Sequence, residues 1–308
     1  MNIGISGASG QLGASVLKDL IGRKSDHRLV GITRSPERAE SEWTNERRAA
    51  GEAAGGGRPQ AVSVEWRFGD YDRPESLAEA YAGLDRLLLI PSPELAAGRR
   101  AEQLNPAIDA AIAAGVGRIV LLSSTSARGS AVPSNGSTYW SSERHLIRGA
   151  SDWQILRMGY FAETFAQEAA MAAAAGSLTG LAENRAALVS RDDVAGAAAG
   201  LLVGEFGGEA VYQATGPASL SGAQRARLVA AASGRPVAFA ALPADTLRAQ
   251  LAAAGLPEES VSAILDIQRD FADGRFDIVT GDVEHLSGRA PRSLERVLAE
   301  AFAGSANG

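Results

Sequence analysis

Short apolar runs recur about every thirty residues in the first half of the chain, and helical patterns lie between them. The runs predict strands at Ile3–Ser6, Leu29–Thr33, Val62–Trp66, Arg86–Ile90, Arg118–Leu122 and Trp153–Leu156. The patterns between them predict helices at Gln11–Ile21, Pro74–Ala82, Arg99–Ala114 and Ser141–Arg148. Strands and helices that alternate in this way indicate an α/β fold with a doubly wound parallel sheet covered on both faces.

Two regions depart from this rhythm. Glu40–Gln60 is rich in charge, alanine and glycine and is longer than a short connection needs, so we expect a surface insertion there. The later elements are predicted as a helix near Phe161–Ala175, a strand at Ala187–Val189, a helix at Asp192–Leu202 and a strand at Ala210–Ala214. The C-terminal third, Ser221–Ala303, reads as helical with one strand near Val237–Ala240, which suits a smaller substrate lobe.

Composition narrows the class of protein. The 308 residues are 45% hydrophobic and 21% charged, without a long apolar run or a basic, apolar leader, so we expect a cytoplasmic protein outside membranes. The formal net charge of −6 disfavours nucleic acid as a partner. The chain has no cysteine, and its three histidines form no metal motif, so neither a disulfide, a thiol nucleophile nor a metal site is predicted. A G-x-S-x-G nucleophile elbow is also absent from the sequence.

A glycine-rich turn follows the first strand directly and opens the first helix, with the sequence Gly7-Ala8-Ser9-Gly10-Gln11-Leu12-Gly13. A pyrophosphate needs backbone N–H donors free of Cβ obstruction, the positive end of a helix dipole and a small residue where helix crosses strand. Gly7, Gly10 and Gly13 meet these needs in order. The spacing differs from the G-x-G-x-x-G dinucleotide fingerprint, and the alternative is a tight turn without a ligand.

The end of the second strand bears on which dinucleotide is bound. Sites selective for NAD usually place an acidic residue there, but this chain has Thr33 followed by Arg34 and Ser35. A guanidinium suits the 2′-phosphate of NADP, so we predict NADP(H) in preference to NAD(H). The alternative is a solvated surface arginine.

Several runs, in this order and spacing, resemble the NmrA-like branch of the atypical short-chain dehydrogenases, which includes NAD(P)H:quinone oxidoreductases and triphenylmethane-dye reductases. These runs are GISGASGQLG at 4–13, TRSPERA at 33–39, GDYDRPESLAEAYAGLDRLLLI at 69–90, NPAIDAAIAAGVGRIVLLSS at 105–124, ILRMGYFAETF at 155–165, SRDDVAGAAA at 190–199, VYQATG at 211–216 and SGRAPRSLERVL at 287–298. The 40–60 insertion is longer than expected in that branch.

The resemblance implies a Rossmann-like domain over residues 1–157, completed by about 187–216, and a smaller α+β C-terminal substrate lobe from residues 158–186 and 217–308. The substrate cleft would lie between them. Carried over by position, the cofactor-binding residues would be Gly7, Ser9, Gly10, Gln11 and Leu12 at the pyrophosphate, Arg34 at the 2′-phosphate, Asp70 and Tyr71 near the adenine, and Ile90, Pro91, Ser92, Ser123, Ser124 and Met158 towards the nicotinamide.

The usual catalytic pair of short-chain dehydrogenases is missing. A tyrosine acid assisted by a lysine four residues later reduces carbonyls in those enzymes, but Tyr139 is followed by Glu143 at that spacing. A carboxylate there would oppose ionisation of the phenol. Ordinary alcohol dehydrogenase chemistry is therefore not expected.

Two functions fit this absence. In the first, hydride passes from NADPH directly to a quinone or another electrophilic aromatic acceptor. The side chains of Tyr139, Trp140, Tyr160 and Phe161 would line the acceptor pocket. The alternative is that these four rings belong to the hydrophobic core. In the second, the protein senses NADP(H) without turnover and acts through a protein partner. We favour the reductase, because the aromatic residues accompany a full glycine loop; a small-molecule substrate is the expected partner, and a homodimer is compatible with the sequence.

Overall fold

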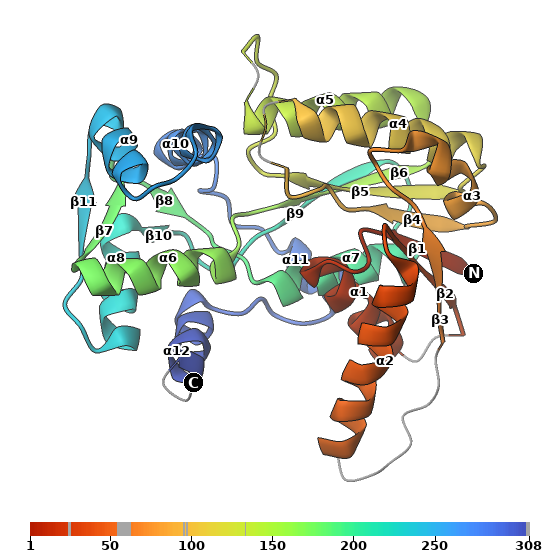
Figure 1. Ribbon diagram of the computed structural model, residues 1–308, viewed down its shortest axis with the longest axis horizontal. Coiled ribbons are helices and arrows are strands. Elements are labelled where there is room, and N and C mark those ends of the chain that lie inside the picture. Colours follow the sequence, from red (N-terminus) through yellow and green to blue (C-terminus); the bar gives the residue numbers. More distant parts are fainter. Residues whose placement is uncertain (24–25, 54–62, 95, 97, 133, 306–308) are drawn as a thin grey trace.

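A seven-stranded parallel sheet forms the centre of the protein (Figure 1). The computed structural model describes residues 1–23, 26–53, 63–94, 96, 98–132 and 134–305. The strand order is β3-β2-β1-β4-β5-β6-β9, and all neighbours run parallel. The strands are β1 (Asn2–Ser6), β2 (Arg28–Thr33), β3 (Val64–Phe68), β4 (Arg86–Leu89), β5 (Arg118–Ser124), β6 (Trp153–Met158) and β9 (Ala210–Ala214).

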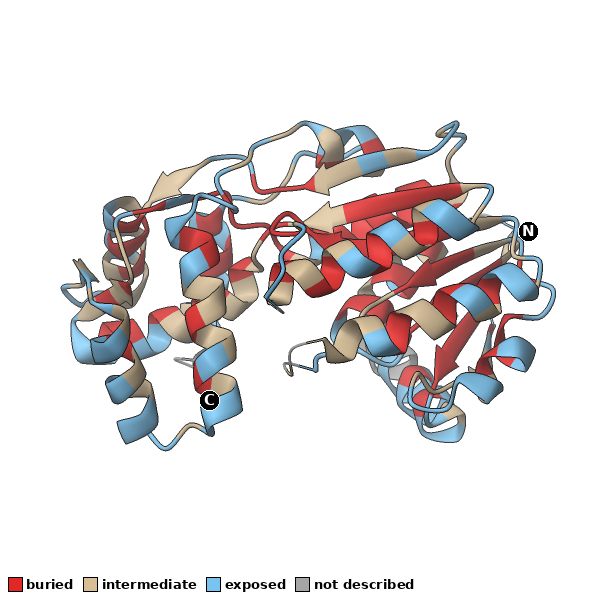
Figure 2. Cartoon of the chain, turned by 90° about the horizontal axis from the view of Figure 1, so that it is seen from above, coloured by how far each residue is buried: buried red, intermediate tan, exposed pale blue. Residues whose placement is uncertain are grey.

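Helices cover both faces of this sheet (Figures 1 and 2). They bury the apolar side chains that the strands carry on both sides. Ile3 and Ile5 of β1 pack on one face, against α1 (Gln11–Gly22), α7 (Arg191–Val203) and α11 (Asp282–Ser287). Val30 and Ile32 of β2 point to the other face, covered by α3 (Leu77–Tyr81), α4 (Arg99–Ala113) and α5 (Asn135–Gly149). The sequence prediction of a doubly wound α/β fold is confirmed.

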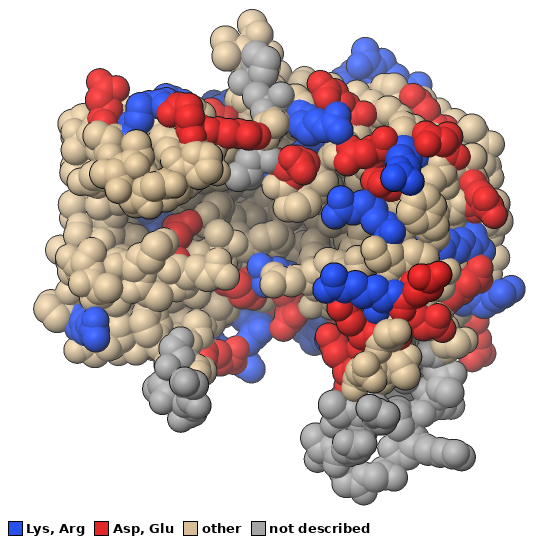
Figure 3. Space-filling model, viewed as in Figure 1, with Lys and Arg blue, Asp and Glu red and all other residues tan. Residues whose placement is uncertain are grey.

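Two further hydrophobic clusters hold the remaining elements together in a smaller lobe beside the sheet (Figure 1). The lobe consists of α6 (Ala162–Ala175), β7 (Ser177–Gly180), β8 (Arg185–Ala186), β10 (Leu220–Ser221), α8 (Gly222–Ser233), β11 (Ala238–Ala241), α9 (Ala244–Ala253), α10 (Glu258–Ala272) and α12 (Leu294–Ser305). The chain enters this lobe after β6, returns to the sheet for α7 and β9, and then leaves again. Charges of both signs intersperse over the sheet-bearing half, and the surface is hollowed between that half and the lobe (Figure 3).

The predicted insertion at 40–60 is wrong over its first part, which belongs to the long helix α2 (Pro36–Ala53). Trp43 is buried and packs edge-on against Trp66 of β3, with ring centroids 6.2 Å apart. This contact, together with the buried Ala39, holds α2 against the sheet although most of the other side chains of the helix are polar. Residues 54–60 lie outside the described residues.

Other boundaries also shift. The predicted strand at Ala187–Val189 is wrong, because this segment makes only one isolated bridge, from Val189 to Phe161, and the regular strands β7 and β8 precede it. Helix α5 begins at Asn135 rather than at Ser141, since Ser134 and Ser137 form a capping box ahead of it. Strand β3 begins at Val64, two residues later than predicted. Within the described residues, no helix is long and apolar enough to span a bilayer.

Candidate dinucleotide site

The ends of β1 to β4 meet along one edge of the sheet, and the loops that follow them are tied together there. The hydroxyls of Ser9 and Thr33 are 2.8 Å apart, which joins the loop after β1 to the end of β2. The phenol of Tyr71, in the loop after β3, donates to the carbonyl of Ile90 after β4 at 3.0 Å. Several of the predicted cofactor residues therefore lie on one connected edge.

The glycine turn has the geometry of a phosphate cradle. Gly7 has φ +87°, which only glycine adopts readily, and its N–H donates to the carbonyl of Ile32 at 3.0 Å. A Cβ on Gly13 would lie 2.4 Å from the Gly7 carbonyl oxygen, so only glycine lets the helix approach the turn this closely. Helix α1 starts at Gln11 with Gly10 as its N-cap, and no side chain caps it.

This uncapped helix end fits a pyrophosphate. The first N–H groups of a helix have no partner inside the helix, and the helix dipole adds partial positive charge at the same place. Gln11, Leu12 and Gly13 supply these N–H groups in α1. Bound phosphate oxygens would satisfy donors that the chain itself leaves open.

Arg34 stands directly after β2, on the same edge. Its side chain is exposed, and its guanidinium has no hydrogen-bond or ion-pair partner among the described residues. The neighbouring Ser35 donates its backbone N–H to Thr33 Oγ1 at 3.4 Å, which holds the turn close to Ser9. A free cation fixed beside the cradle suits a phosphate on the adenosine ribose.

The predicted residues after β3 and β4 have internal partners. The Asp70 carboxylate accepts the backbone N–H of Asp72 at 3.0 Å, which closes its own turn. The Ser92 hydroxyl donates to Gln103 Oε1 of α4 at 2.5 Å, while Arg100 Nε donates to the Ser92 carbonyl at 3.0 Å. Pro91 lies between Ile90 and Ser92, directly after β4. These contacts give the edge a fixed shape.

A buried polar group lies where β5 and β6 end. The Ser123 hydroxyl donates to Glu143 Oε1 at 2.6 Å, and Arg157 of β6 binds the same carboxylate through two nitrogens, at 2.8 and 2.6 Å. The Glu143 side chain is only 2% exposed. Hydrogen bonding to Glu143 raises the pKa of Arg157. The carboxylate that replaces the usual lysine is thus fully engaged inside the protein.

The four predicted aromatic residues form two groups rather than one wall. Tyr139 of α5 is buried, and the Arg100 guanidinium carbon lies 5.3 Å from the centre of the Tyr139 ring. The Arg144 guanidinium carbon lies 5.8 Å from the centre of the Trp140 ring. Tyr160 and Phe161, after β6, make no ring contact with that pair among the described residues. Ser124 and Met158 are register partners between these groups.

Tyr160 belongs to the core of the lobe. Its ring packs edge-on against Phe271 and Phe276, at centroid distances of 5.1 and 5.8 Å. Its hydroxyl donates to Glu168 Oε1 at 2.5 Å, and burial raises the pKa of the Glu168 carboxyl. The ring thus has the core role that the sequence left open as an alternative.

Sequence reasoning missed some residues of this region. Thr33 and Arg157 each make their contacts with residues distant in sequence, so a local pattern carries no signal for them. Phe68 ends β3 with 42% of its surface exposed, opposite Thr33 of β2, which an apolar run alone does not reveal. Arg191 stood within one of the family-like runs, at the start of α7, but its environment became visible only in the structure.

Known proteins match the chain closely. A family model described as NAD(P)H-binding matches residues 7–204. Quinone oxidoreductase 2 of Escherichia coli (strain K12) is 31% identical over 270 residues, which cover 86% of each chain.

Two solved structures extend the comparison to three dimensions. The NADPH-dependent quinone oxidoreductase of Escherichia coli, complexed with NADPH, aligns with a TM-score of 0.81 and 28% identity over 99% of this chain and 100% of that one. The Citrobacter sp. triphenylmethane reductase complexed with NADP(H) aligns with a TM-score of 0.83, over 97% of this chain and 99% of that one. Its 23% identity supports the shared fold alone.

These matches agree with the cradle at β1 and α1, and they confirm the resemblance seen in the sequence. Both the family model and the relative span well over half of the chain. The chain therefore belongs to the NAD(P)H-binding family, in the NmrA-like branch of the atypical short-chain dehydrogenases.

Proposed function

We propose that the protein is an NADPH-dependent reductase whose acceptors are quinones or similarly electrophilic aromatic compounds. Family membership supports the reductase class, and the quinone oxidoreductase of Escherichia coli supports the acceptor type. The observation that carries the proposal is the Glu143–Arg157 pair, which occupies the position where a dehydrogenase lysine would assist Tyr139. An acceptor that needs no acid from that pair fits such a site best.

A quinone meets this condition. When bound, NADPH supplies a hydride, and the quinone takes up this hydride and one proton from water to become the hydroquinone while NADPH becomes NADP⁺. The protein's own part is to hold the pyrophosphate at the N–H groups of α1 and to present the nicotinamide end near β5 and β6. Orientation of this kind contributes to catalysis without a side-chain acid.

An assay of NADPH oxidation tests the proposal. We expect turnover with menadione or 1,4-benzoquinone and none with a simple aliphatic ketone, which needs an acid to protonate its oxygen. NADPH binding is measured in parallel by titration. Binding without turnover of any quinone or triarylmethane dye would overturn the reductase and favour the sensor with a protein partner. A lack of binding would overturn the cofactor site itself.

The exposed guanidinium after β2 gives a test of cofactor preference. Replacing Arg34 by Glu removes one charge-assisted contact to the 2′-phosphate and adds repulsion, so we expect NADPH affinity to fall about 10- to 100-fold. NADH affinity should be unchanged or higher. The matched control is Arg28→Glu, because Arg28 is an exposed arginine at the opposite end of the same strand. Unchanged NADPH affinity in Arg34→Glu would mean that another group recognises the 2′-phosphate.

A further inference from the structure

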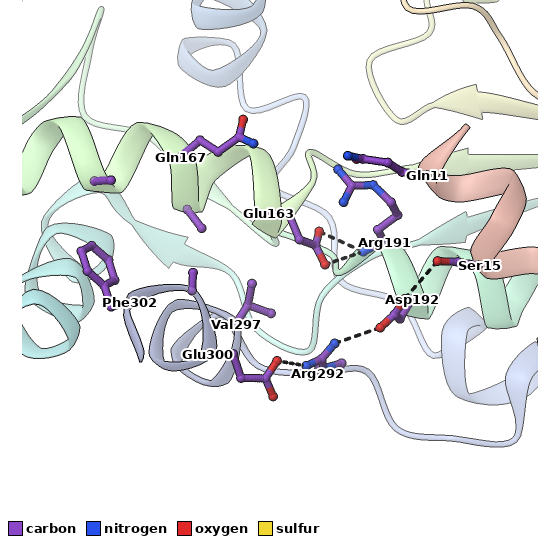
Figure 4. Close-up of a pocket in the computed structure, with 13 residues that line it drawn as sticks. Gln11, Ser15, Glu163, Gln167, Arg191, Asp192, Arg292, Val297, Glu300 and Phe302 are labelled. Carbon is purple, nitrogen blue, oxygen red and sulfur yellow. Dashed lines mark hydrogen bonds and ion pairs between the residues drawn. The ribbon is translucent and has the colours of Figure 1, made fainter. Parts of the chain in front are cut away.

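A cavity of about 640 Å³ lies between the start of α1, the start of α7, and the lobe helices α6 and α12 (Figure 4). Neither Tyr139 nor Trp140 lines it, because both belong to α5 on the other face of the sheet. Its volume falls within the roughly 300–1,000 Å³ typical of small-molecule sites. The cavity is therefore a candidate site distinct from the Tyr139–Trp140 group, and it adjoins Phe161 through Arg191.

Three of the five charged side chains that line the cavity form one group of ion pairs. Arg292 pairs with Asp192 at 3.2 Å and also with Glu300. The Glu163 carboxylate accepts the backbone N–H of Arg191 with both oxygens, each at 3.0 Å. These contacts close the helix and loop ends around the cavity. Among the described residues they leave two lining charges without an ion-pair partner, the Glu163 carboxylate and one cation.

That cation is the guanidinium of Arg191. It lies 5.2 Å from the ring centre of Phe161, and it has no hydrogen-bond or ion-pair partner among the described residues. The side chain of Gln11 points towards it from the first turn of α1 (Figure 4). A planar fork of donors beside an amide is a geometry that binds carboxylates and sulfonates well.

The opposite end of the cavity is apolar. Ala166 and Ala170 of α6 and Val297 and Phe302 of α12 line it there, where the two helices pack on each other through Ala166 and Val297. Ala170 is exposed and Phe302 is partly exposed, so an apolar body can lie against these two side chains. The cavity thus has one cationic end and one apolar end.

We propose that this cavity binds a ligand with a single acidic group and an apolar aromatic body. The acidic group lies on Arg191, and the body lies against Ala170 of α6 and Phe302 of α12. This binding site does not depend on the proposed reductase function. The folded protein can bind such a ligand in the cavity whether or not it oxidises NADPH. Bound next to Gln11, such a ligand adjoins the helix end that we assign to the cofactor.

Two fluorescent probes that differ in one charge test the proposal. 8-Anilino-1-naphthalenesulfonate carries one sulfonate, and N-phenyl-1-naphthylamine is its uncharged counterpart. Arg191→Gln should weaken binding of the sulfonate about tenfold or more and leave the neutral probe within twofold. Ala170→Trp fills the apolar end and should weaken both probes. Arg148→Gln, an exposed arginine on α5, should change neither.

The outcomes separate the sources of a bound anion. Equal losses for both probes in Arg191→Gln, or no loss for either, would overturn the proposal. The titrations are repeated with saturating NADP⁺, and NADP⁺ affinity is measured for each variant. If Arg191→Gln weakens NADP⁺ and the charge discrimination disappears when NADP⁺ is bound, the guanidinium serves the cofactor diphosphate and the proposal also fails. Probe binding needs no turnover, so this test is independent of the reductase assay.

Discussion

Replacing Gly13 by Val is expected to lower NADPH affinity at least 100-fold. The added Cβ would lie 2.4 Å from the Gly7 carbonyl oxygen and 2.7 Å from Ala8 Cα, and both are backbone atoms that cannot turn aside as a flexible side chain would. The turn must therefore move away from α1, and the N–H groups that we assign to the pyrophosphate lose their shared geometry. Titration of the protein with NADPH measures the loss.

Gly22→Ala is the matched control, because Gly22 lies in the same helix with nothing within 4 Å of its Cβ position. It should keep full affinity and gain about 0.5–1 kcal/mol of stability. If Gly13→Val fails to fold, Gly10→Ala gives a milder test, since its Cβ meets the Gly7 oxygen only at 3.3 Å. Normal NADPH affinity in a folded Gly13 variant would contradict the cradle.

The second large effect is expected from Glu143→Gln. This change leaves the Arg157 guanidinium without its counter-charge in a site where the carboxylate is 2% exposed, so we expect a loss of about 3–5 kcal/mol in the free energy of unfolding. Urea unfolding monitored by circular dichroism measures it. The double variant Glu143→Leu with Arg157→Leu should be more stable than the single variant, because it removes both charges together.

An exposed ion pair provides the comparison for this second effect. Lys18 and Glu46 approach to 2.8 Å, but their side chains are 57% and 58% exposed. Glu46→Gln should therefore cost less than about 1 kcal/mol. Equal costs in the two variants would show that burial of the Glu143–Arg157 pair contributes nothing special to stability.

Local patterns predicted the sheet and the glycine turn well, because both depend on short-range features. Six strands are recognisable as apolar runs, and the spacing of Gly7, Gly10 and Gly13 marks the start of α1 directly. The short ladder of β7 with β11 was not predicted in full, since it pairs segments far apart in the chain. Helix α2 was missed because its segment is mostly polar and few of its side chains, among them Ala39 and Trp43, are buried.

The candidate site follows the same division. Arg34 was predicted as a cofactor-binding residue because the position directly after the second strand usually contacts the adenosine ribose in dinucleotide-binding folds. The engagement of Glu143 by Arg157 and Ser123 was not, since each contact joins residues on different elements. Which charged side chains pair with each other depends on the folded structure. The sequence can therefore identify a charged residue such as Glu143 but not its ion-pair partner.

The pairing of β6 with β9 also bears on synthesis of the protein. The sheet edge at β6 is complete only when β9 is available, and α6, β7, β8 and α7 are made between these two strands. On the ribosome, an apolar strand with unpaired backbone groups must therefore wait while the first three elements of the lobe and α7 emerge. Exposed strand edges of this kind recruit other chains. We expect nascent chains that stall before Ala210 to aggregate or to recruit chaperones more than chains released after Ala214.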